Sequence, residues 1–305
     1  MSSSTPSCRI CDAAADHQRV RAPHVFGSDG KHNFWECGEC SAVYLFPVPS
    51  RDEEKRFYAQ EFEKFMSTRS GRERDWTNAE SHKVTNQDQV RRRWSFLGDF
   101  IIPHNSVLEI GCSSGFMLDA FRDAGMRCTG VEPSGEFLPY LRKQGHNAYE
   151  TLREIEPDSL FDLIVHFFVF EHIRDPYSFL EIIWSHLKPG GAMVAEIPCV
   201  NDPLTSIYSI PAFEKFYWSI AHHYYYSPDS LSYVLDRLGY PYRLEAEQRY
   251  DLSNHMYWMA QGKPGGQGIY NNVLGDSVIS AYRDSLKASW NCDTIILYIT
   301  KPCSD

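Results

Sequence analysis

The chain has 305 residues and a formal net charge of −10, and 43% of its residues are hydrophobic. This apolar content can offset the conformational entropy lost on folding, which excludes a disordered chain. The length suits one main domain with a small additional module. The acidic balance argues against nonspecific binding of nucleic acid, because neutralising phosphates requires a basic surface.

No segment has the features of a secretory signal or a membrane span. The N-terminus lacks a basic region and an apolar core, and the longest apolar run, residues 161–170, is interrupted by Asp162 and His166. We therefore expect a cytoplasmic protein. In that compartment its nine cysteines should be thiols or metal ligands rather than disulfides.

Two Cys-X-X-Cys pairs lie in the first fifty residues. Cys8 and Cys11 form one pair and Cys37 and Cys40 form the other, with 25 residues between the pairs. Each pair can direct two sulfur atoms at one ion, and two pairs complete a tetrahedral site. A site with four protein ligands is closed, so we predict a structural Zn²⁺ in a zinc ribbon at residues 1–50. Four incidental thiols are the alternative.

The next segments predict a helical connection to the main domain. Residues 43–50 have the composition of a proline-containing linker, and residues 51–65 have the pattern of an amphipathic helix. Residues 66–86 are polar and predict a loop, whereas residues 88–102 predict a helix that ends before Pro103. We assign residues 51–95 as a helical linker that covers the cofactor, and residues 96–305 as the main domain.

Residues 106–119 carry a nucleotide-binding pattern. A short apolar strand precedes a turn with Gly111 and Gly115, and an apolar helix follows. Gly111 allows a tight turn, and Gly115 allows a ligand to approach the backbone closely. A second strand, about twenty residues on, ends in Glu132, an acid that suits a ribose diol.

The spacing of this turn differs from a dinucleotide fingerprint, which has glycines at its first, third and sixth positions. Here the two glycines are four residues apart, and Glu109 stands directly before the turn. Its carboxylate would repel a pyrophosphate but attract the ammonium group of a methionine moiety. The site therefore suits a cation with an amino acid tail better than it suits NAD.

These residues resemble the motifs of class I S-adenosylmethionine-dependent methyltransferases. Residues 109–115 resemble the first motif, with Ser113 where many members have a middle glycine, and residues 130–134 resemble the second. Residues 161–176 resemble the fourth motif, and residues 187–198 resemble the turn and fifth strand that follow it. The four motifs occur in order, which a single glycine-rich loop would not provide.

The resemblance implies a doubly wound, Rossmann-like α/β fold with a seven-stranded sheet and S-adenosylmethionine as cofactor. Residues 242–250 and 294–300 are candidates for the C-terminal antiparallel strand pair of that sheet. The resemblance also implies which residues bind the cofactor: Glu109, Gly111, Cys112, Ser113, Gly115, Phe116, Glu132, Pro133, His166 and Phe167. Residues 147–156 give no adenine ligand.

The ribbon and the tyrosine-rich segment before Ser227 resemble a bacterial subfamily that methylates sugars. In its sugar C-methyltransferases a histidine before a Tyr-Phe-Ser run acts as base, and alignment on Ser227 makes it His222 here. The glutamate that precedes that base is Ala221 in this chain. A glutamate-histidine pair, such as Glu171 and His172, is widespread among O-methyltransferases, so we expect an O-methyl product.

Two segments therefore offer catalytic groups at the carboxyl edge of the sheet, where ligands bind in this fold. Glu171 and His172 follow the fourth strand, and His222 and His223 end an insertion at residues 199–226. We prefer His222 as general base, with His172 second; packing is the alternative for both insertion histidines. Some related methyltransferases chelate magnesium through an acid one turn before such a pair. Residues 166–168 hold no acid, so we expect no second metal.

A second insertion, residues 250–290, would cover the acceptor. Its candidate contacts are Asn254, His255 and Trp258, together with Tyr224 from the first insertion. They combine hydrogen-bonding groups with flat apolar faces, a mixture that suits carbohydrates. Packing within the protein is the alternative for each of them.

The leading hypothesis is methyl transfer to a hydroxyl of a small acceptor, a sugar on a nucleotide sugar or glycan precursor. One alternative is C-methylation of a deoxy-keto nucleotide sugar. Another is methylation of RNA or protein recruited by the ribbon. The last is a non-catalytic binding module, against which the intact glycine turn and its acids argue.

Overall fold

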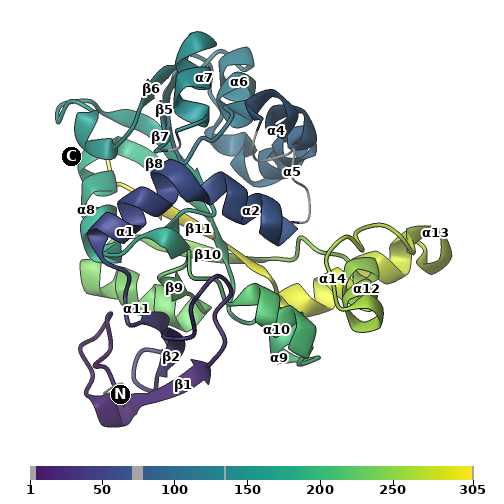
Figure 1. The fold of residues 1–305 in the computed structure, drawn as a ribbon. Coiled ribbons are helices and arrows are strands. Elements are labelled where there is room, and N and C mark those ends of the chain that lie inside the picture. Colours follow the sequence, from purple (N-terminus) through teal and green to yellow (C-terminus); the bar gives the residue numbers. More distant parts are fainter. Residues whose placement is uncertain (1–4, 71–77, 134, 304–305) are drawn as a thin grey trace.

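The computed structural model describes residues 5–70, 78–133 and 135–303. Its centre is a seven-stranded sheet with the order β10-β11-β8-β7-β4-β5-β6, in which β11 runs antiparallel to both of its neighbours (Figure 1). The strands are β4 (Ser106–Ile110), β5 (Arg127–Val131), β6 (Asn147–Tyr149), β7 (Phe161–Phe167), β8 (Leu187–Pro198), β10 (Tyr242–Glu247) and β11 (Thr294–Thr300). This confirms the predicted doubly wound sheet and its C-terminal antiparallel pair.

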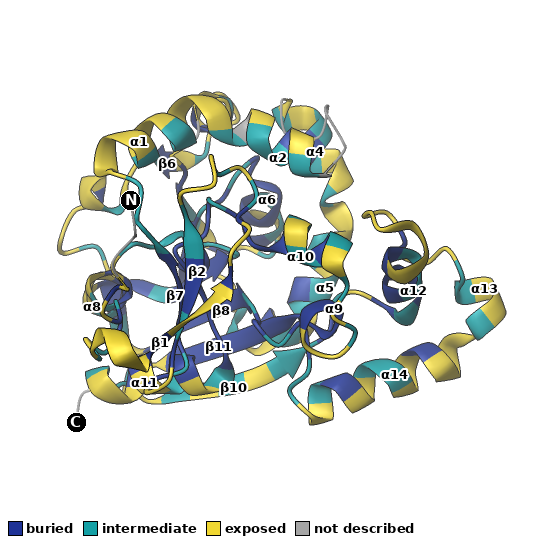
Figure 2. Ribbon diagram, turned by 60° about the horizontal axis from the view of Figure 1, so that its bottom comes forward, coloured by how far each residue is buried: buried dark blue, intermediate teal, exposed yellow. Residues whose placement is uncertain are grey.

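Helices cover both faces of the sheet, so its central strands are buried on both sides (Figure 2). On one face β4 and β7 pack in a cluster with α5 (Gln87–Leu97) and α6 (Phe116–Asp123). On the other face they pack against α8 (Pro176–His186) and α11 (Pro228–Leu238). The remaining crossover helix, α7 (Phe137–Lys143), lies between β5 and β6 in the chain.

Local sequence signals determine where two helices begin or end near the carboxyl edge of the main sheet. Ser227 caps α11 by accepting a hydrogen bond from the backbone N–H of Ser230, and Pro228 occupies the first helical position. Gly239 ends the same helix with φ 70°. In α8 the side chain of Asp175 accepts from the N–H of Ser178. These caps leave the loops before both helices at the carboxyl edge of the sheet.

A second sheet joins the N-terminal segment to the main domain. Its order is β1-β2-β3-β9, and all of its pairs are antiparallel. The strands are β1 (Gln18–Ala22), β2 (Asn33–Cys37), β3 (Val43–Phe46) and β9 (Tyr224–Tyr225). Residues 43–46, expected to be linker, are thus a strand, because they pair on one side with β2 and on the other with the tyrosine-rich segment.

A helical segment crosses the main sheet between the ribbon and α5 (Figure 1). It comprises α1 (Arg51–Arg56), a π-helical turn (Phe57–Glu61), α2 (Phe62–Ser70) and α4 (Ala79–Thr85). The loop expected at residues 66–86 is therefore helical at residues 66–70 and 79–85; residues 71–77 lie outside the described residues. Buried Ser67 and His82 explain the difference, because tertiary packing stabilises helices whose own sequence is polar.

The remaining helices belong to the two insertions. The first contains α9 (Pro203–Ser206) and α10 (Pro211–Tyr217), and the second contains α12 (Leu252–Gln261), α13 (Asn271–Leu274) and α14 (Asp276–Ala288). The second group projects to one side of the sheet (Figure 1). Among the described residues, no helix combines the length and the apolar character that crossing a membrane requires.

Candidate active site

The glycine turn after β4 lies between two acidic side chains. Gly111 and Gly115 both have positive φ, 71° and 77°, which glycine adopts without strain. A Cβ on Gly111 would lie 2.6 Å from the side chain of Val169, in the loop after β7. The carboxylate of Glu132 accepts a 2.6 Å hydrogen bond from the backbone N–H of Ser113. The turn therefore holds Glu132 in place and adjoins the loop that carries Glu171.

Glu109 lies on the same strand with its side chain buried. Burial raises the pKa of its carboxyl to about 8, against a smaller lowering by Arg93. Its Oε2 atom has no hydrogen-bond partner among the described residues. A buried acid without a full set of partners is suited to receive a cationic ligand group.

Helix α4 covers the glycine turn. The Nδ1 atom of His82 lies 2.8 Å from the hydroxyl of Ser114, and its ring lies 5.0 Å from that of Phe137 and 6.1 Å from that of Phe116. Farther along, the Cβ position of Gly135 lies 3.0 Å from the carbonyl oxygen of Ala59. The segment assigned as a cofactor cover thus contacts both the glycine turn after β4 and the loop after β5.

Two residues expected at the cofactor point elsewhere. The thiol of Cys112 is buried against Leu118 and Leu141, so its backbone alone faces the turn. His166 pairs in register with Ile110, whereas Glu109 pairs with Val165. Side chains alternate between the faces of a strand, so His166 and Glu109 lie on opposite faces. His166 packs against Phe170 and Phe179 instead, and burial lowers its pKa to about 3.

The other expected cofactor residues stay predictions. Phe116 begins α6 and is buried, and Phe167 ends β7 on the same face as Glu109. Pro133 is exposed directly after Glu132. The guanidinium of Arg93 lies over both aromatic rings, 5.4 Å from the centre of Phe116 and 3.9 Å from that of Phe167.

Three expected catalytic residues meet beside this turn. Potential ligand atoms of Glu171, His172 and His222 lie within 4.8 Å of one another, and the rings of the two histidines are 4.7 Å apart. Burial raises the pKa of Glu171 to about 8 and lowers that of His172 to about 4. The pKa of His222 is also lowered well below its usual value by burial. Near neutral pH both imidazoles therefore carry a free nitrogen lone pair.

His223, in contrast, has both ring nitrogens occupied. Its Nε2 donates to Glu54 at 2.6 Å, and its Nδ1 accepts from the guanidinium of Arg9 at 3.4 Å. Glu54 also binds Arg174, at 2.6 Å. The network joins the ribbon, α1 and the loop after β7. Neither ring nitrogen of His223 is therefore free to take a proton, in contrast to the expectation that it is a catalytic residue.

All four expected acceptor contacts are buried, and the structure shows internal partners for the side chains of Tyr224, Trp258 and His255. Tyr224 is buried and donates to the carbonyl of Arg174 at 3.2 Å, with Arg9 over its ring. Trp258 packs between Phe213 and Phe216. His255 is buried, with Nδ1 2.6 Å from the hydroxyl of Tyr282. Asn254 lies in the first turn of α12, where its N–H is bound by Asp251, and is buried too.

Sequence reasoning missed a cluster of arginines at the same sheet edge. Arg92, Arg93 and Arg249 surround the fully buried carboxylate of Glu196 on β8, at N–O distances of 2.6, 3.2 and 3.7 Å. Arg249 also covers the ring of Phe168. The residues lie far apart in the chain, and the arginines of α5 have the sequence pattern of an exposed helix face. No local signal could have identified them.

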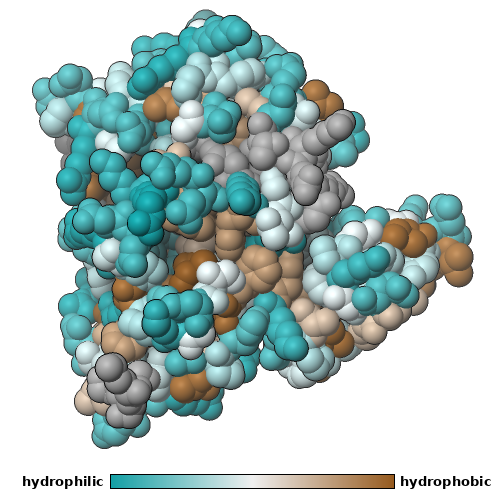
Figure 3. All heavy atoms as spheres, viewed as in Figure 1, coloured by the Kyte–Doolittle hydropathy of each residue, from teal (hydrophilic) through white to brown (hydrophobic). Residues whose placement is uncertain are grey.

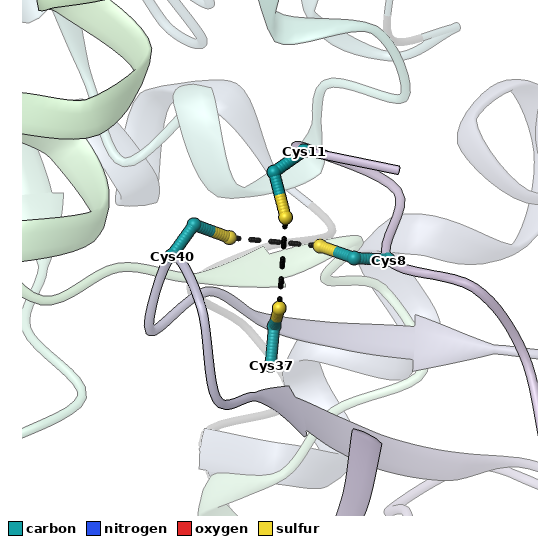
Figure 4. A group of neighbouring side chains, drawn as sticks. All are labelled: Cys8, Cys11, Cys37 and Cys40. Carbon is teal, nitrogen blue, oxygen red and sulfur yellow. Dashed lines mark hydrogen bonds between the residues drawn. The ribbon is translucent and has the colours of Figure 1, made fainter. Parts of the chain in front are cut away.

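The four cysteines of the N-terminal pairs converge on one point (Figure 4). The Sγ atoms of Cys8 and Cys40 are 3.6 Å apart, as are those of Cys11 and Cys37. All four sulfur atoms lie within 4.8 Å of one another. Backbone N–H groups of Ile10 and Glu39 point at Cys8 and Cys37, both at 3.4 Å. Tetrahedral Zn²⁺ with bonds of about 2.3 Å requires a sulfur cage of this size.

A comparison with known proteins identifies the fold and the family of the chain. The structure aligns with that of the plantazolicin methyltransferase BpumL in complex with SAH, with a TM-score of 0.50 and 14% identity, over 82% of this chain and 93% of that one. Residues 82–244, more than half of the chain, match the family model of a methyltransferase domain. The chain therefore belongs to this methyltransferase family, which confirms the predicted class of enzyme.

The relatives in sequence are methyltransferases of different kinds. The ubiquinone biosynthesis O-methyltransferase of Bradyrhizobium sp. (strain ORS 278) is 33% identical over 95 residues, which cover 29% of this chain and 38% of the relative. The tRNA U34 carboxymethyltransferase of Alteromonas mediterranea is 25% identical over 179 residues, covering 52% and 53%. The chain spans well under two thirds of either relative's length. Neither name is that of a sugar methyltransferase.

Proposed function

We propose that this chain transfers the methyl group of S-adenosylmethionine to a hydroxyl of a small polar acceptor, a sugar on a nucleotide sugar or glycan precursor. One observation carries the proposal. A glycine turn flanked by two acids adjoins, through the contact of Gly111 with Val169, a buried cluster of a carboxyl and two neutral imidazoles. Such an arrangement suits a cationic donor beside an acceptor that must lose a proton.

In this proposal Glu109 pairs with the ammonium group of the cofactor, and Glu132 accepts the two ribose hydroxyls. The acceptor oxygen attacks the methyl carbon in line with the sulfur, the carbon–sulfur bond breaks, and S-adenosylhomocysteine leaves. The proton of the hydroxyl goes to a histidine nitrogen, His222 first and His172 second. The apolar side chains at the centre of the face shown in Figure 3 would help to exclude water.

The zinc ribbon, in the same proposal, holds a structural Zn²⁺ on Cys8, Cys11, Cys37 and Cys40. The sulfur distances support the ion, and the four thiolates would leave no coordination position open for water or substrate. The ion would therefore stabilise the fold beside the active site and take no part in methyl transfer.

Binding of labelled S-adenosylmethionine tests the cofactor site. Glu132→Ala should weaken binding about 10- to 100-fold, because hydrogen bonds to a charged group contribute about 1.5–3 kcal/mol. Glu150→Ala, which removes an exposed acid beyond the next strand, should bind as wild type does. Unchanged binding by the Glu132 variant would remove this residue from the site.

A screen of nucleotide sugars and free sugars for release of S-adenosylhomocysteine tests the acceptor. His222→Ala should lower kcat about 10²- to 10⁴-fold, the contribution typical of a general base, while cofactor binding persists. His104→Asn, which changes an exposed histidine, is the matched control. NMR of the product separates a new O-methyl group from the C-methyl group of the rival hypothesis.

A transfer RNA acceptor is a second candidate, favoured by the tRNA-modifying relative and by the ribbon. The net charge of −10 opposes it. Filter binding of bulk tRNA at two salt concentrations distinguishes the two acceptors, since an RNA enzyme should retain the nucleic acid at low salt.

A further inference from the structure

The cluster of Glu171, His172 and His222 has the composition of a metal site separate from the ribbon. Glu171 and His222 are only 1% and 7% exposed. They come from different segments, which the fold ties together one residue away, where the N–H of His223 donates to the carbonyl of Glu171 at 2.7 Å. The expectation of no second metal rests on residues 166–168 alone, whereas His222 lies fifty residues beyond the glutamate-histidine pair.

Two polar atoms of the cluster are buried without a hydrogen bond. These are Oε2 of Glu171 and Nδ1 of His222, neither of which has a partner among the described residues. Buried polar atoms in native proteins are nearly always satisfied, by the chain itself, by water, by an ion or by a substrate. Both atoms therefore call for a ligand that the chain does not supply.

The third member is oriented as metal-ligating histidines are. Nδ1 of His172 lies 2.8 Å from the carbonyl oxygen of Ala221; a carbonyl only accepts, so Nδ1 carries the hydrogen. Nε2 is then a free lone pair, 3.9 Å from Oε1 of Glu171. Metal-bound histidines usually donate their other N–H to a carbonyl or carboxylate, which fixes the tautomer and the ring. The hydroxyl oxygen of Tyr58 lies 2.9 Å from the same Nδ1, where it can accept a hydrogen bond and help to hold the ring in this orientation.

We propose that Glu171, His172 and His222 bind one divalent transition-metal cation of the Zn²⁺ type. Two imidazole nitrogens and one carboxylate oxygen are a donor set for such ions, whereas Mg²⁺ and Ca²⁺ require oxygen ligands. Three protein ligands leave at least one position open. The site therefore differs from the closed four-cysteine site both in its donor atoms and in its access to a further ligand.

The catalytic consequence rests on the proposed function. An acceptor hydroxyl in the open position becomes more acidic, as water does on a Zn²⁺ ion, and releases its proton to solvent. The oxygen then takes the methyl group, the carbon–sulfur bond breaks, and S-adenosylhomocysteine leaves with the bonding electron pair. The lone pair of one imidazole nitrogen can bind a proton or a metal ion, but not both. In the metal-bound enzyme the cation therefore activates the hydroxyl in place of His222.

Metal analysis after equilibrium dialysis of the full chain against Zn²⁺ tests the site. Wild type should bind two ions per chain, and Glu171→Gln and His222→Gln should bind one. His104→Asn, which also removes an imidazole, should bind two. Tyr58→Phe should keep both ions but bind the second about 10- to 100-fold more weakly, as changes around the first ligands do. Uptake of a single ion by wild type, or of two by the Glu171 and His222 variants, overturns the proposal.

Replacing Zn²⁺ by Co²⁺ gives a readout that does not depend on the variants' folding. In the wild-type protein the ring protons of His172 and His222 should show strongly shifted NMR signals, distinct from those of the cysteine site. Their absence at saturating Co²⁺ contradicts the site. The experiments also separate the two proposals. A chain that binds two ions but transfers no methyl group contradicts only the proposed function. A chain that transfers methyl groups fully with one bound ion contradicts only the second metal site.

Discussion

At the scale of single residues, the buried acid Glu109 connects the sequence pattern to the chemistry of the donor. Burial raises the pKa of its carboxyl to about 8. The ligand-free protein therefore keeps this group mostly protonated at neutral pH. A bound ammonium group would favour the ionised form and lower that pKa, because opposite charges at short range stabilise each other. Cofactor binding and proton release are then linked.

The affinity for S-adenosylmethionine should therefore rise with pH. Between the lowered pKa of the complex and the pKa of about 8 in the free protein, each pH unit should tighten binding by up to about tenfold. Above about pH 8 the affinity should level off. Calorimetry in two buffers of different ionisation enthalpy should find up to one proton released near neutral pH.

Glu109→Gln is the control for this linkage. Its binding should be weaker but should lose the contribution of this group to the pH dependence, because an amide does not titrate. A variant that keeps the full pH dependence would assign the released proton to another group. Glu171 is the nearest alternative, since burial raises its pKa to a similar value.

Residues in local motifs could be predicted, and those that depend on the fold could not. Glu109, Gly111, Gly115 and Glu132 lie within one strand-turn-helix unit or at the end of the next strand, so their spacing alone predicts that they meet at one edge of the sheet. The side chain of His166 lies on the face opposite Glu109, as the alternation of side chains along a strand implies. Arg93 and Arg249 gave no signal, because only tertiary structure brings them to Glu196.

At the scale of elements, the short strand β9 links the ribbon to the catalytic segment. Tyr224 pairs with Tyr44 and Tyr225 pairs with Val43, and β9 begins two residues after His222. Arg9, from the first cysteine knuckle, donates to the carbonyl of Leu45 at 3.3 Å and to that of Arg174 at 3.2 Å, and also approaches His223. The ribbon thus contacts the backbone on both sides of the histidine cluster.

Arg9→Ala should therefore affect turnover as well as stability. Its loss removes hydrogen bonds from a guanidinium in a half-buried network, at a cost of about 1.5–3 kcal/mol, and it frees His223. We expect kcat to fall about tenfold with cofactor affinity unchanged, measured by steady-state kinetics and calorimetry.

Arg19→Ala provides the comparison for Arg9. Arg19 lies in the same ribbon, is exposed, and pairs with Glu36; exposed pairs contribute about 0–1 kcal/mol. Its kcat should match that of wild type. An equal loss of turnover in both variants would mean that the ribbon acts only through overall stability.

Sequence patterns predicted the regular elements better than the segments between the modules. Strands β4 and β7 and helix α11 carry continuous apolar runs or end signals, and all three were expected. Pro47 and Pro49 favour a linker at residues 43–50, but residues 43–46 form strand β3, whose partner β9 lies far away in the chain. Helix α4 is mostly polar and owes its place to buried His82 on the glycine turn.

At the scale of the whole molecule, the ribbon and the main domain share one hydrophobic core. The cluster that contains Leu108 and Ile164 of the central strands also contains Ile10, Trp35 and three of the four cysteines. Tyr224 and Tyr226 of the first insertion lie in the same cluster. The ribbon therefore differs from a domain attached through a flexible linker, because such a domain would have a hydrophobic core of its own.

Removal of the Zn²⁺ proposed for the ribbon should therefore destabilise the whole chain. Structural Zn²⁺ sites in small domains contribute about 10–16 kcal/mol of apparent binding energy to folding, and here the lost order would expose core shared with the main domain. We expect a chelator to lower the midpoint of thermal unfolding in a single transition, seen alike by far-ultraviolet circular dichroism and by tryptophan fluorescence. S-adenosylmethionine should then bind more weakly, because β9 and the histidine segment lose their partner strand.

If the ribbon were independent, two transitions would separate instead, and the upper one would keep its midpoint and its stabilisation by cofactor. Glu171→Gln serves as the control for metal assignment, since it spares the cysteine site: chelation should still lower its midpoint as in the wild type.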